Sequence, residues 1–153
     1  MPLRDQPVRL PTVLCVDDEH HVLNALDRVL HGYDCRVLLA SDGWDALDLL
    51  EQEEIDVLIC DAAMPGMDGL EVLREATTIA PATVRILLTA HCSNEEVVIP
   101  AVNEGEIFRL LSKPWDDGEL RRTVADALGL EPKAWLEQQH RLRERDRNGD
   151  ART

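Results

Sequence analysis

The sequence predicts a doubly wound α/β domain, in which helices cover both faces of a parallel sheet. Short apolar runs alternate along the chain with segments whose apolar residues recur every three or four positions, the spacing of a helix that buries one face. The short runs are apolar at nearly every position, as in strands that are buried on both faces. Runs and helical segments alternate strictly, and this order favours parallel strands joined by crossover helices.

The predicted strands are short and rich in Val, Ile and Leu. Polar residues directly follow the first, third and fifth runs, so these strand ends are visible in the sequence. The five runs lie at residues 12–16, 35–39, 55–60, 84–89 and 107–111.

The predicted helices fill the intervals between the strands and follow the last one. Residues that can cap a helix, such as Asp42, Asp68 and Asp116, stand at or near their starts. Pro100 interrupts the fourth, where it would kink the helix or restrict its start. The segments are 20–31, 43–52, 68–79, 94–104 and 116–128.

The chain is 153 residues long, which suits one domain with a short extension at each end. Leu128, Trp135 and Leu142 are spaced by seven residues, so the last segment could pair two copies of the chain as a coiled coil. A helix that frays or packs back on the domain explains the same spacing. We expect a leader, the domain and a helical, partly disordered tail or linker stub at 1–11, 12–128 and 129–153.

The net charge of −14 resides in the predicted domain. Residues 1–128 hold 10 basic and 25 acidic residues, whereas 129–153 hold 6 and 5. An acidic body argues against direct nucleic-acid binding, because phosphate contacts need Lys and Arg. No apolar stretch approaches the ~18 residues of a membrane span, and the start lacks a signal-peptide core. Four cysteines without a C-x-x-C pair indicate reduced thiols, so we expect a cytoplasmic protein.

Polar and charged side chains stand where the predicted strands end. Asp17 and Asp18 follow the first strand, and Asp61 follows the third. Thr89 ends the fourth strand, and Lys113 comes shortly after the fifth. The carboxyl ends of parallel strands meet at one edge of a sheet, where doubly wound domains bind their ligands. Carboxylates are suitable ligands for Mg²⁺. The ammonium group of Lys113 and the hydroxyl of Thr89 can bind phosphoryl oxygens. Asp61 could then serve both as a metal ligand and as the nucleophile.

Each of these residues also has a simpler explanation. An Asp-Asp pair after a strand can cap a helix or lie on a charged surface, Lys113 can be a solvated charge, and Thr89 can be an ordinary strand residue. Their joint occurrence at four of the five predicted strand ends favours a single site for a metal and a phosphoryl group. Pro114 directly follows Lys113, which makes this X-Pro bond a candidate for a cis peptide.

Four motifs resemble those of the receiver domain of two-component response regulators. Each motif alone is weak, whereas all four in this order and at these separations are specific, and they span about three quarters of the chain. The resemblance implies a flavodoxin-like receiver fold, a five-stranded parallel sheet with the strand order 2-1-3-4-5. The motifs are Val16-Asp17-Asp18-Glu19, Asp61-Ala62-Ala63-Met64-Pro65-Gly66-Met67-Asp68-Gly69, Leu88-Thr89-Ala90-His91 and Leu111-Ser112-Lys113-Pro114-Trp115.

The resemblance also implies the partners and the chemistry. A histidine kinase or phosphotransfer protein would pass a phosphoryl group to Asp61. Mg²⁺ or Mn²⁺ would be held by Asp18, Asp61 and the carbonyl of Ala63, with Asp17 nearby through water. Lys113 would pair with the phosphoryl group.

The implied switch lies on the face formed by the fourth helix, fifth strand and fifth helix. Thr89, followed by Ala90, would swing toward the phosphoryl group, and this face would then control an output domain or a partner protein. Receivers commonly carry an aromatic residue three positions before the lysine, whereas this chain has Leu110. In receivers, the places that Ala63 and His91 hold in this chain line the path of the hydrolytic water, so the resemblance implies that His91 tunes the phosphoryl lifetime.

Two other classes of protein stay open. One is a phosphorylation-independent interaction module with a receiver fold, against which the complete set of acids, Thr89 and Lys113 argues. The other is a Mg²⁺-dependent aspartyl phosphatase, which would carry its nucleophile after the first strand with a second Asp two residues on; Asp17-Asp18-Glu19 lacks that spacing. We therefore expect no enzyme acting on an external substrate, only gain and loss of the chain's own phosphoryl group.

Overall fold

A computed structural model describes residues 10–31, 34–90 and 107–129 of the chain, and the structural statements below concern these residues. The predicted fourth helix, most of the leader and nearly all of the tail lie outside them. The elements, in chain order, are β1 (Thr12–Val16), α1 (His20–Leu30), β2 (Arg36–Ala40), α2 (Gly43–Gln52), β3 (Val57–Asp61), α3 (Gly69–Ile79), β4 (Val84–Thr89), β5 (Arg109–Ser112) and α5 (Asp117–Ala127).

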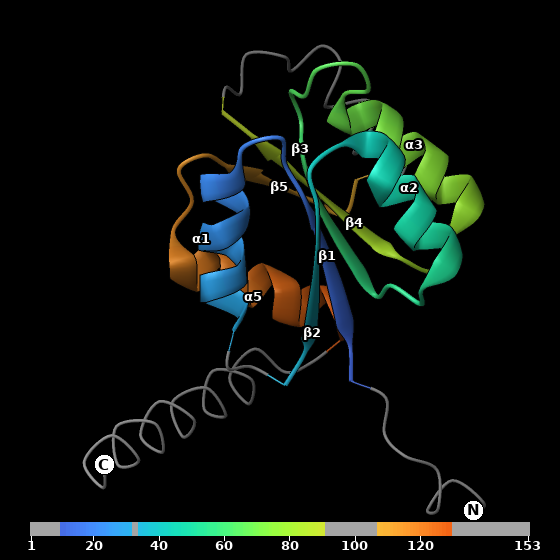
Figure 1. The fold of residues 1–153 in the computed structure, drawn as a ribbon. Coiled ribbons are helices and arrows are strands. Elements are labelled where there is room, and N and C mark those ends of the chain that lie inside the picture. Colours follow the sequence, from blue (N-terminus) through green and yellow to red (C-terminus); the bar gives the residue numbers. More distant parts are fainter. Residues whose placement is uncertain (1–9, 32–33, 91–106, 130–153) are drawn as a thin grey trace, which may run out of the picture.

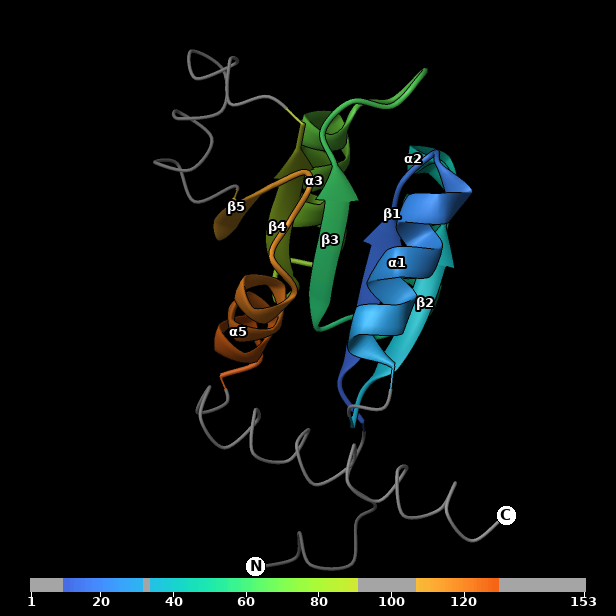
Figure 2. The ribbon, with the colours of Figure 1, turned by 90° about the vertical axis from the view of Figure 1, so that its left-hand side faces the viewer.

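The strands form one parallel sheet in the order β2-β1-β3-β4-β5 (Figure 1), which confirms the predicted fold. Helices α1 and α5 cover one face of the sheet, and α2 and α3 cover the other (Figures 1 and 2). The sequence order therefore reverses direction at β1, the point at which doubly wound sheets open a crevice for ligands.

Each face of the sheet has its own hydrophobic core. Side chains alternate along a strand, so neighbouring residues of β1 and β3 enter opposite cores. Leu14 and Leu58 pack toward α2 and α3, whereas Cys15 and Ile59 pack toward α1 and α5. Burial on both faces explains why these two strands are apolar almost throughout.

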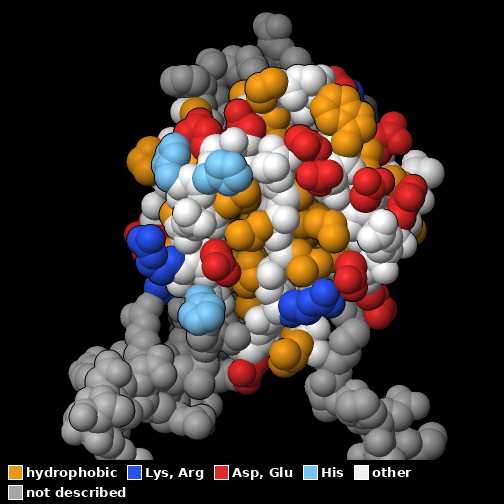
Figure 3. Space-filling model, in the orientation of Figure 1, with side chains coloured by type: hydrophobic (Ala, Val, Ile, Leu, Met, Phe, Trp, Pro, Cys, Tyr) orange, Lys and Arg blue, Asp and Glu red, His pale blue; other side chains and the backbone are white. Residues whose placement is uncertain are grey.

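Strand β2 forms one open edge of the sheet. Its side chains Val37 and Leu38 are partly buried, whereas Leu39 is 40% exposed. Apolar side chains accordingly gather along the middle of the face over β2, with acidic side chains around them (Figure 3). Pairing with β1 begins at Arg36, one residue later than predicted. The first bond of this pairing is donated by the Arg36 N–H to the carbonyl of Pro11, at 2.8 Å.

Other boundaries also differ from the prediction by one or two residues. β3 begins at Val57 rather than residue 55, because Asp56 is used to clamp the start of β1: its carboxylate accepts the Thr12 N–H at 2.8 Å. β5 begins at Arg109, since Ile107 is buried in the core ahead of the ladder. Asp68 and Asp116 precede their helices as N-caps, accepting backbone N–H groups of Glu71 and Glu119 at 2.9 Å.

Candidate functional site

The carboxyl edge of the sheet gathers the predicted site residues. Backbone bonds continue the ladders past the strands: Ala62 N–H donates to Leu88 at 2.7 Å, and Lys113 N–H donates to Thr89 at 2.9 Å. These bonds fix the β3–α3 loop and the segment after β5 at the height of the last residues of β4. Lys113 is thereby held beside the end of the neighbouring strands.

Lys113 joins two carboxylates that lie far apart in the sequence. Its Nζ is 2.6 Å from Asp17 Oδ2 and 2.8 Å from Asp61 Oδ1. The side chains of Asp17, Asp61 and Lys113 are 0%, 7% and 16% exposed. Buried charges need such partners, since leaving either carboxylate without a cation would cost several kcal/mol. Lys113 is the cation that allows two acids to share this edge.

The electrostatics of the site reflect this balance. Burial raises the pKa of Asp61 above its ordinary value, and the neighbouring carboxylates of Asp17 and Asp18 add to that rise, although the hydrogen bond from Lys113 opposes it. Burial acts to lower the pKa of Lys113, but hydrogen bonds to Asp17 and Asp61 outweigh burial, so this pKa lies above its ordinary value. Lys113 is therefore held in its cationic form.

A cluster of acids stands beside this pair. One carboxylate oxygen from each of Asp17, Asp18 and Glu19 lies within 4.8 Å of the others. Asp17 also accepts the backbone N–H of Glu19 at 2.9 Å, which fixes the turn between β1 and α1. An all-oxygen set with two exposed members fits a hard divalent cation that keeps several waters.

The acidic cluster and the predicted ligand set share Asp17 and Asp18. Glu19 is the third member of the cluster, and the predicted ligand Asp61 lies beside it, in contact with Lys113. Glu19 is not among the residues predicted to hold a metal. Its position directly after the acidic pair is the signal in the sequence, because the first residues after a strand stay close together before the next helix begins.

The β3–α3 loop, residues 62–68, brings Ala63 to the same edge. Gly69 N–H donates to the carbonyl of Ala62 at 3.0 Å, which closes the loop at its base. Gly69 packs so closely there that a Cβ would collide with the Asp61 carbonyl oxygen and Ala62 Cα. Ala63 and Gly66 are exposed on the arch of this loop, and Gly66 has a φ of 82°, a conformation that favours glycine.

The remaining predicted residues have different surroundings. Thr89 is buried at the end of β4, whereas Ala90 is exposed. The Lys113–Pro114 peptide bond is cis. Leu110 packs against the core on the α2 and α3 side. His91 lies outside the residues that the structure describes.

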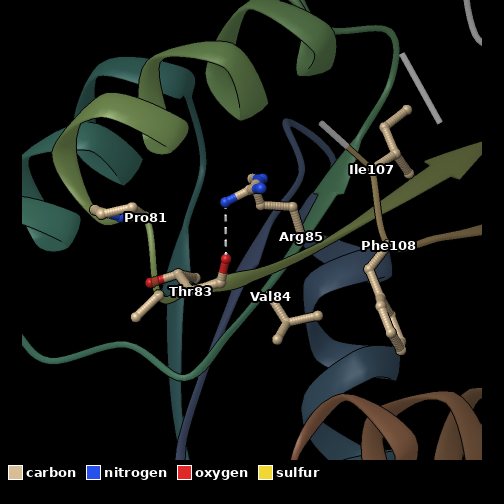
Figure 4. Close-up of a pocket in the computed structure, with 7 residues that line it drawn as sticks. Pro81, Thr83, Val84, Arg85, Ile107 and Phe108 are labelled. Atoms are coloured by element: carbon tan, nitrogen blue, oxygen red, sulfur yellow. Dashed lines mark hydrogen bonds between the residues drawn. The ribbon is translucent and has the colours of Figure 1, made fainter. Parts of the chain in front are cut away.

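Around the residues that the structure describes, surface hollows lie at opposite ends of the sheet. A hollow of about 360 Å³ adjoins the acidic site and is lined by Glu19, His21, Val22, Ala25, Lys113, Pro114 and Trp115. The other, of about 390 Å³, lies at the amino ends of β4 and β5, where Arg85 donates to the carbonyl of Thr83 at 3.0 Å (Figure 4). Of the predicted site residues within the described ranges, none lines the second hollow.

The fold and this acidic edge define a class: doubly wound domains that present carboxylates and a lysine beyond the strands. The chain matches the response regulator receiver domain over residues 13–125, and it belongs to this family. Receivers of this family serve phosphoacceptor signalling to an output domain.

In the described part of the chain, no helix is both long and apolar enough to cross a bilayer.

Individual relatives agree with the family. The hydrogenase transcriptional regulatory protein HoxA of Cupriavidus necator is 37% identical over 131 residues, covering 86% of this chain and 26% of HoxA. The transcriptional regulatory protein ZraR of Escherichia coli K12 is 33% identical over 116 residues, covering 76% of this chain and 26% of ZraR. The chain thus spans about a quarter of the length of these relatives.

Solved structures show the same likeness. The signal receiver domain of an HD domain-containing protein from Pseudomonas fluorescens Pf-5 is 38% identical, with a TM-score of 0.74 over 92% of this chain and 96% of that one. A response regulator receiver domain protein from Clostridium thermocellum is 31% identical, with a TM-score of 0.72 over 78% of this chain and 95% of that one.

Proposed function

We propose that this chain is a signalling switch in which Asp61 accepts a phosphoryl group from a phosphohistidine on a histidine kinase or phosphotransfer protein. The observation that carries the proposal is the double contact of Lys113 with Asp17 and Asp61 at the carboxyl edge of the sheet. Lys113 already contacts the acceptor Asp61, so its ammonium group can pair with the negative charge that a phosphoryl group adds there.

The transfer itself is a displacement at phosphorus. A carboxylate oxygen of Asp61 attacks, the phosphorus–nitrogen bond of the phosphohistidine breaks, and the imidazole leaves with the electron pair of that bond. Lys113 favours the ionised form of Asp61 before transfer and neutralises a phosphoryl oxygen afterwards. The product is an acyl phosphate on Asp61.

We propose Mg²⁺, or Mn²⁺, as the cation of this site, because the oxygen donors of Asp17, Asp18 and Glu19 suit such an ion. Asp61 and the carbonyl of Ala63 would complete the set. The ion would supply neutralisation of the negative charge that gathers at the phosphoryl group.

The output side of the switch follows from the charge that phosphorylation adds. Thr89 stands at the end of β4, next in the sheet to Asp61, and would turn toward the phosphoryl oxygens with the Thr89–Ala90 backbone. Lys113 would exchange part of its contact with Asp17 for the new group. Both shifts act on the face of β5 and α5, which we propose controls an output domain or a partner protein.

Several broader features are part of the same proposal. The chain would act in the cytoplasm without turnover of an external substrate, and His91 and Ala63 would tune the loss of the phosphoryl group. The domain would extend over 12–128, with 129–153 as a tail or linker whose heptad spacing would serve any pairing of two copies. Contact with nucleic acid or membrane is not part of this role.

The test is phosphorylation by acetyl phosphate in the presence of Mg²⁺, followed by intact mass. We expect one labile phosphoryl group per chain, lost when a chelator replaces Mg²⁺ and lost in Asp61→Asn. Metal binding without incorporation would contradict the switch. It would favour the phosphorylation-independent interaction module instead.

A further inference from the structure

We infer that Trp44 is a positioning residue that holds the β3–α3 loop over the metal and phosphoryl site. The inference rests on the proposed function, because the loop matters through the Ala63 carbonyl and Asp61. It adds a residue from α2, an element that contributes none of the predicted site residues.

The contact between Trp44 and the loop is close. A Cβ on Gly66 would lie 2.6 Å from Cη2 and 2.9 Å from Cζ3 of the Trp44 indole. The distal edge of the ring therefore occupies the space in which any other residue would place its side chain. Trp44 is nevertheless 55% exposed, so the indole lies against the loop at the surface rather than in the core.

The first turn of α2 and the loop form one packed unit. Gly43, directly before Trp44, is buried, and a Cβ there would lie 2.9 Å from Met67 Sδ and 2.9 Å from Val72 Cγ2. Asp42 caps this helix by accepting the Asp45 N–H at 2.8 Å. The capped helix start thus gives the indole a fixed platform from which to reach Gly66.

The loop needs support at its arch. Its base is fixed by backbone bonds at Ala62 and Gly69, while Ala63 and Gly66 are exposed. Gly66 has a φ of 82°, and a glycine at an unsupported turn can adopt many backbone conformations. The indole excludes the backbone conformations that would move Gly66 into the space of its ring. A carbonyl at Ala63 then keeps one orientation, as a metal ligand requires.

The test measures Mg²⁺ affinity of the full chain from amide shifts in ¹H–¹⁵N NMR spectra, with thermal melting recorded in parallel. The variants are Trp44→Ala and Trp44→Phe, and the matched control is Phe108→Ala, which removes another exposed aromatic side chain at the opposite end of the sheet. Since the contact uses the distal ring atoms of the indole, a phenyl ring is too short to replace it.

We expect both Trp44 variants to bind Mg²⁺ about tenfold more weakly, as when a group supporting a metal ligand is lost, with Phe108→Ala unchanged. Wild-type affinity in either Trp44 variant would overturn the inference and leave the proposed function intact. An equal loss in Phe108→Ala would also overturn it, because the effect would then be general. Absence of Mg²⁺ binding in the wild type would overturn both proposals.

Discussion

Lys113 is the residue on which the site depends most. Two buried carboxylates repel one another in a low-dielectric setting, and the ammonium between Asp17 and Asp61 turns that repulsion into two short ion pairs. The same geometry makes the site responsive, because a new negative group on Asp61 competes directly for this one cation.

Replacing Lys113 by Met keeps the alkyl stem and removes the charge. We expect Lys113→Met to lower the free energy of unfolding in urea by about 3 kcal/mol at neutral pH, because a buried carboxylate loses its partner. Adding Asp17→Asn should restore part of the loss. A change below about 1 kcal/mol would show that Asp17 needs no cation in the folded chain.

Thiol reactivity gives a pH-dependent test at Cys35. Burial raises its pKa from 9.0 to about 11, and nearby Asp34 adds to the rise. The folded chain should hold about a hundredfold less Cys35 thiolate at pH 8 than the unfolded chain. In a Cys92→Ser variant, iodoacetamide labelling of Cys35 should therefore keep rising with pH beyond 9, where labelling in urea levels off. Equal rates in both states would contradict this.

At the scale of elements, the join between β3 and α3 decides where Asp61 points. The strand ends at Asp61, and the helix returns to the same backbone eight residues later through Gly69. Only a residue without a Cβ permits that approach. The loop between them can then present Ala63 and Gly66 at the edge of the sheet.

Gly69→Ala should therefore destabilise the fold by about 3 kcal/mol or more, because backbone atoms rather than a flexible side chain must move. Gly118→Ala is the matched control: it also lies in a first helical turn, but a Cβ there would meet only side-chain atoms of Asp116 and Arg122 at 3.2 and 3.3 Å. Chemical denaturation measures both. Equal effects would mean that the close approach is not what requires glycine.

Much of this arrangement could be predicted from the sequence, for identifiable reasons. Strands β1 and β4 have the predicted limits, since their apolar runs coincide with their paired residues. β3 begins later because Asp56 bonds across to Thr12, a contact between distant residues that no local pattern records. Asp17, Asp61 and Lys113 stand at the ends of predicted parallel strands, which predicted that they share one edge of the sheet, and the contacts of Lys113 place them there. The contact of Trp44 with Gly66 depends on packing between α2 and a loop, and periodicity does not reveal it.

At the scale of the whole molecule, acidity couples stability to cations. The chain carries a formal charge of −14, so self-repulsion opposes the compact state and any salt relieves part of it. A specific site adds a second effect, because an ion that binds only the folded chain stabilises it by mass action.

MgCl₂ should therefore raise the melting temperature more than NaCl of equal ionic strength. At about 100 times its dissociation constant, Mg²⁺ would add about 2.7 kcal/mol. The difference between the two salts should vanish in Asp17→Asn/Asp18→Asn, which removes two members of the acidic cluster. If the double variant keeps the full difference, the ion binds elsewhere on the acidic surface.

The most direct test of the central claim locates the phosphoryl group itself. The chain is treated with acetyl phosphate and Mg²⁺, reduced with borohydride, which converts an aspartyl phosphate to homoserine, and mapped by peptide mass spectrometry. We predict homoserine at position 61 and at no other aspartate. Homoserine at Asp17 or Asp18 with Asp61 unmodified would contradict the assignment of Asp61 as the acceptor.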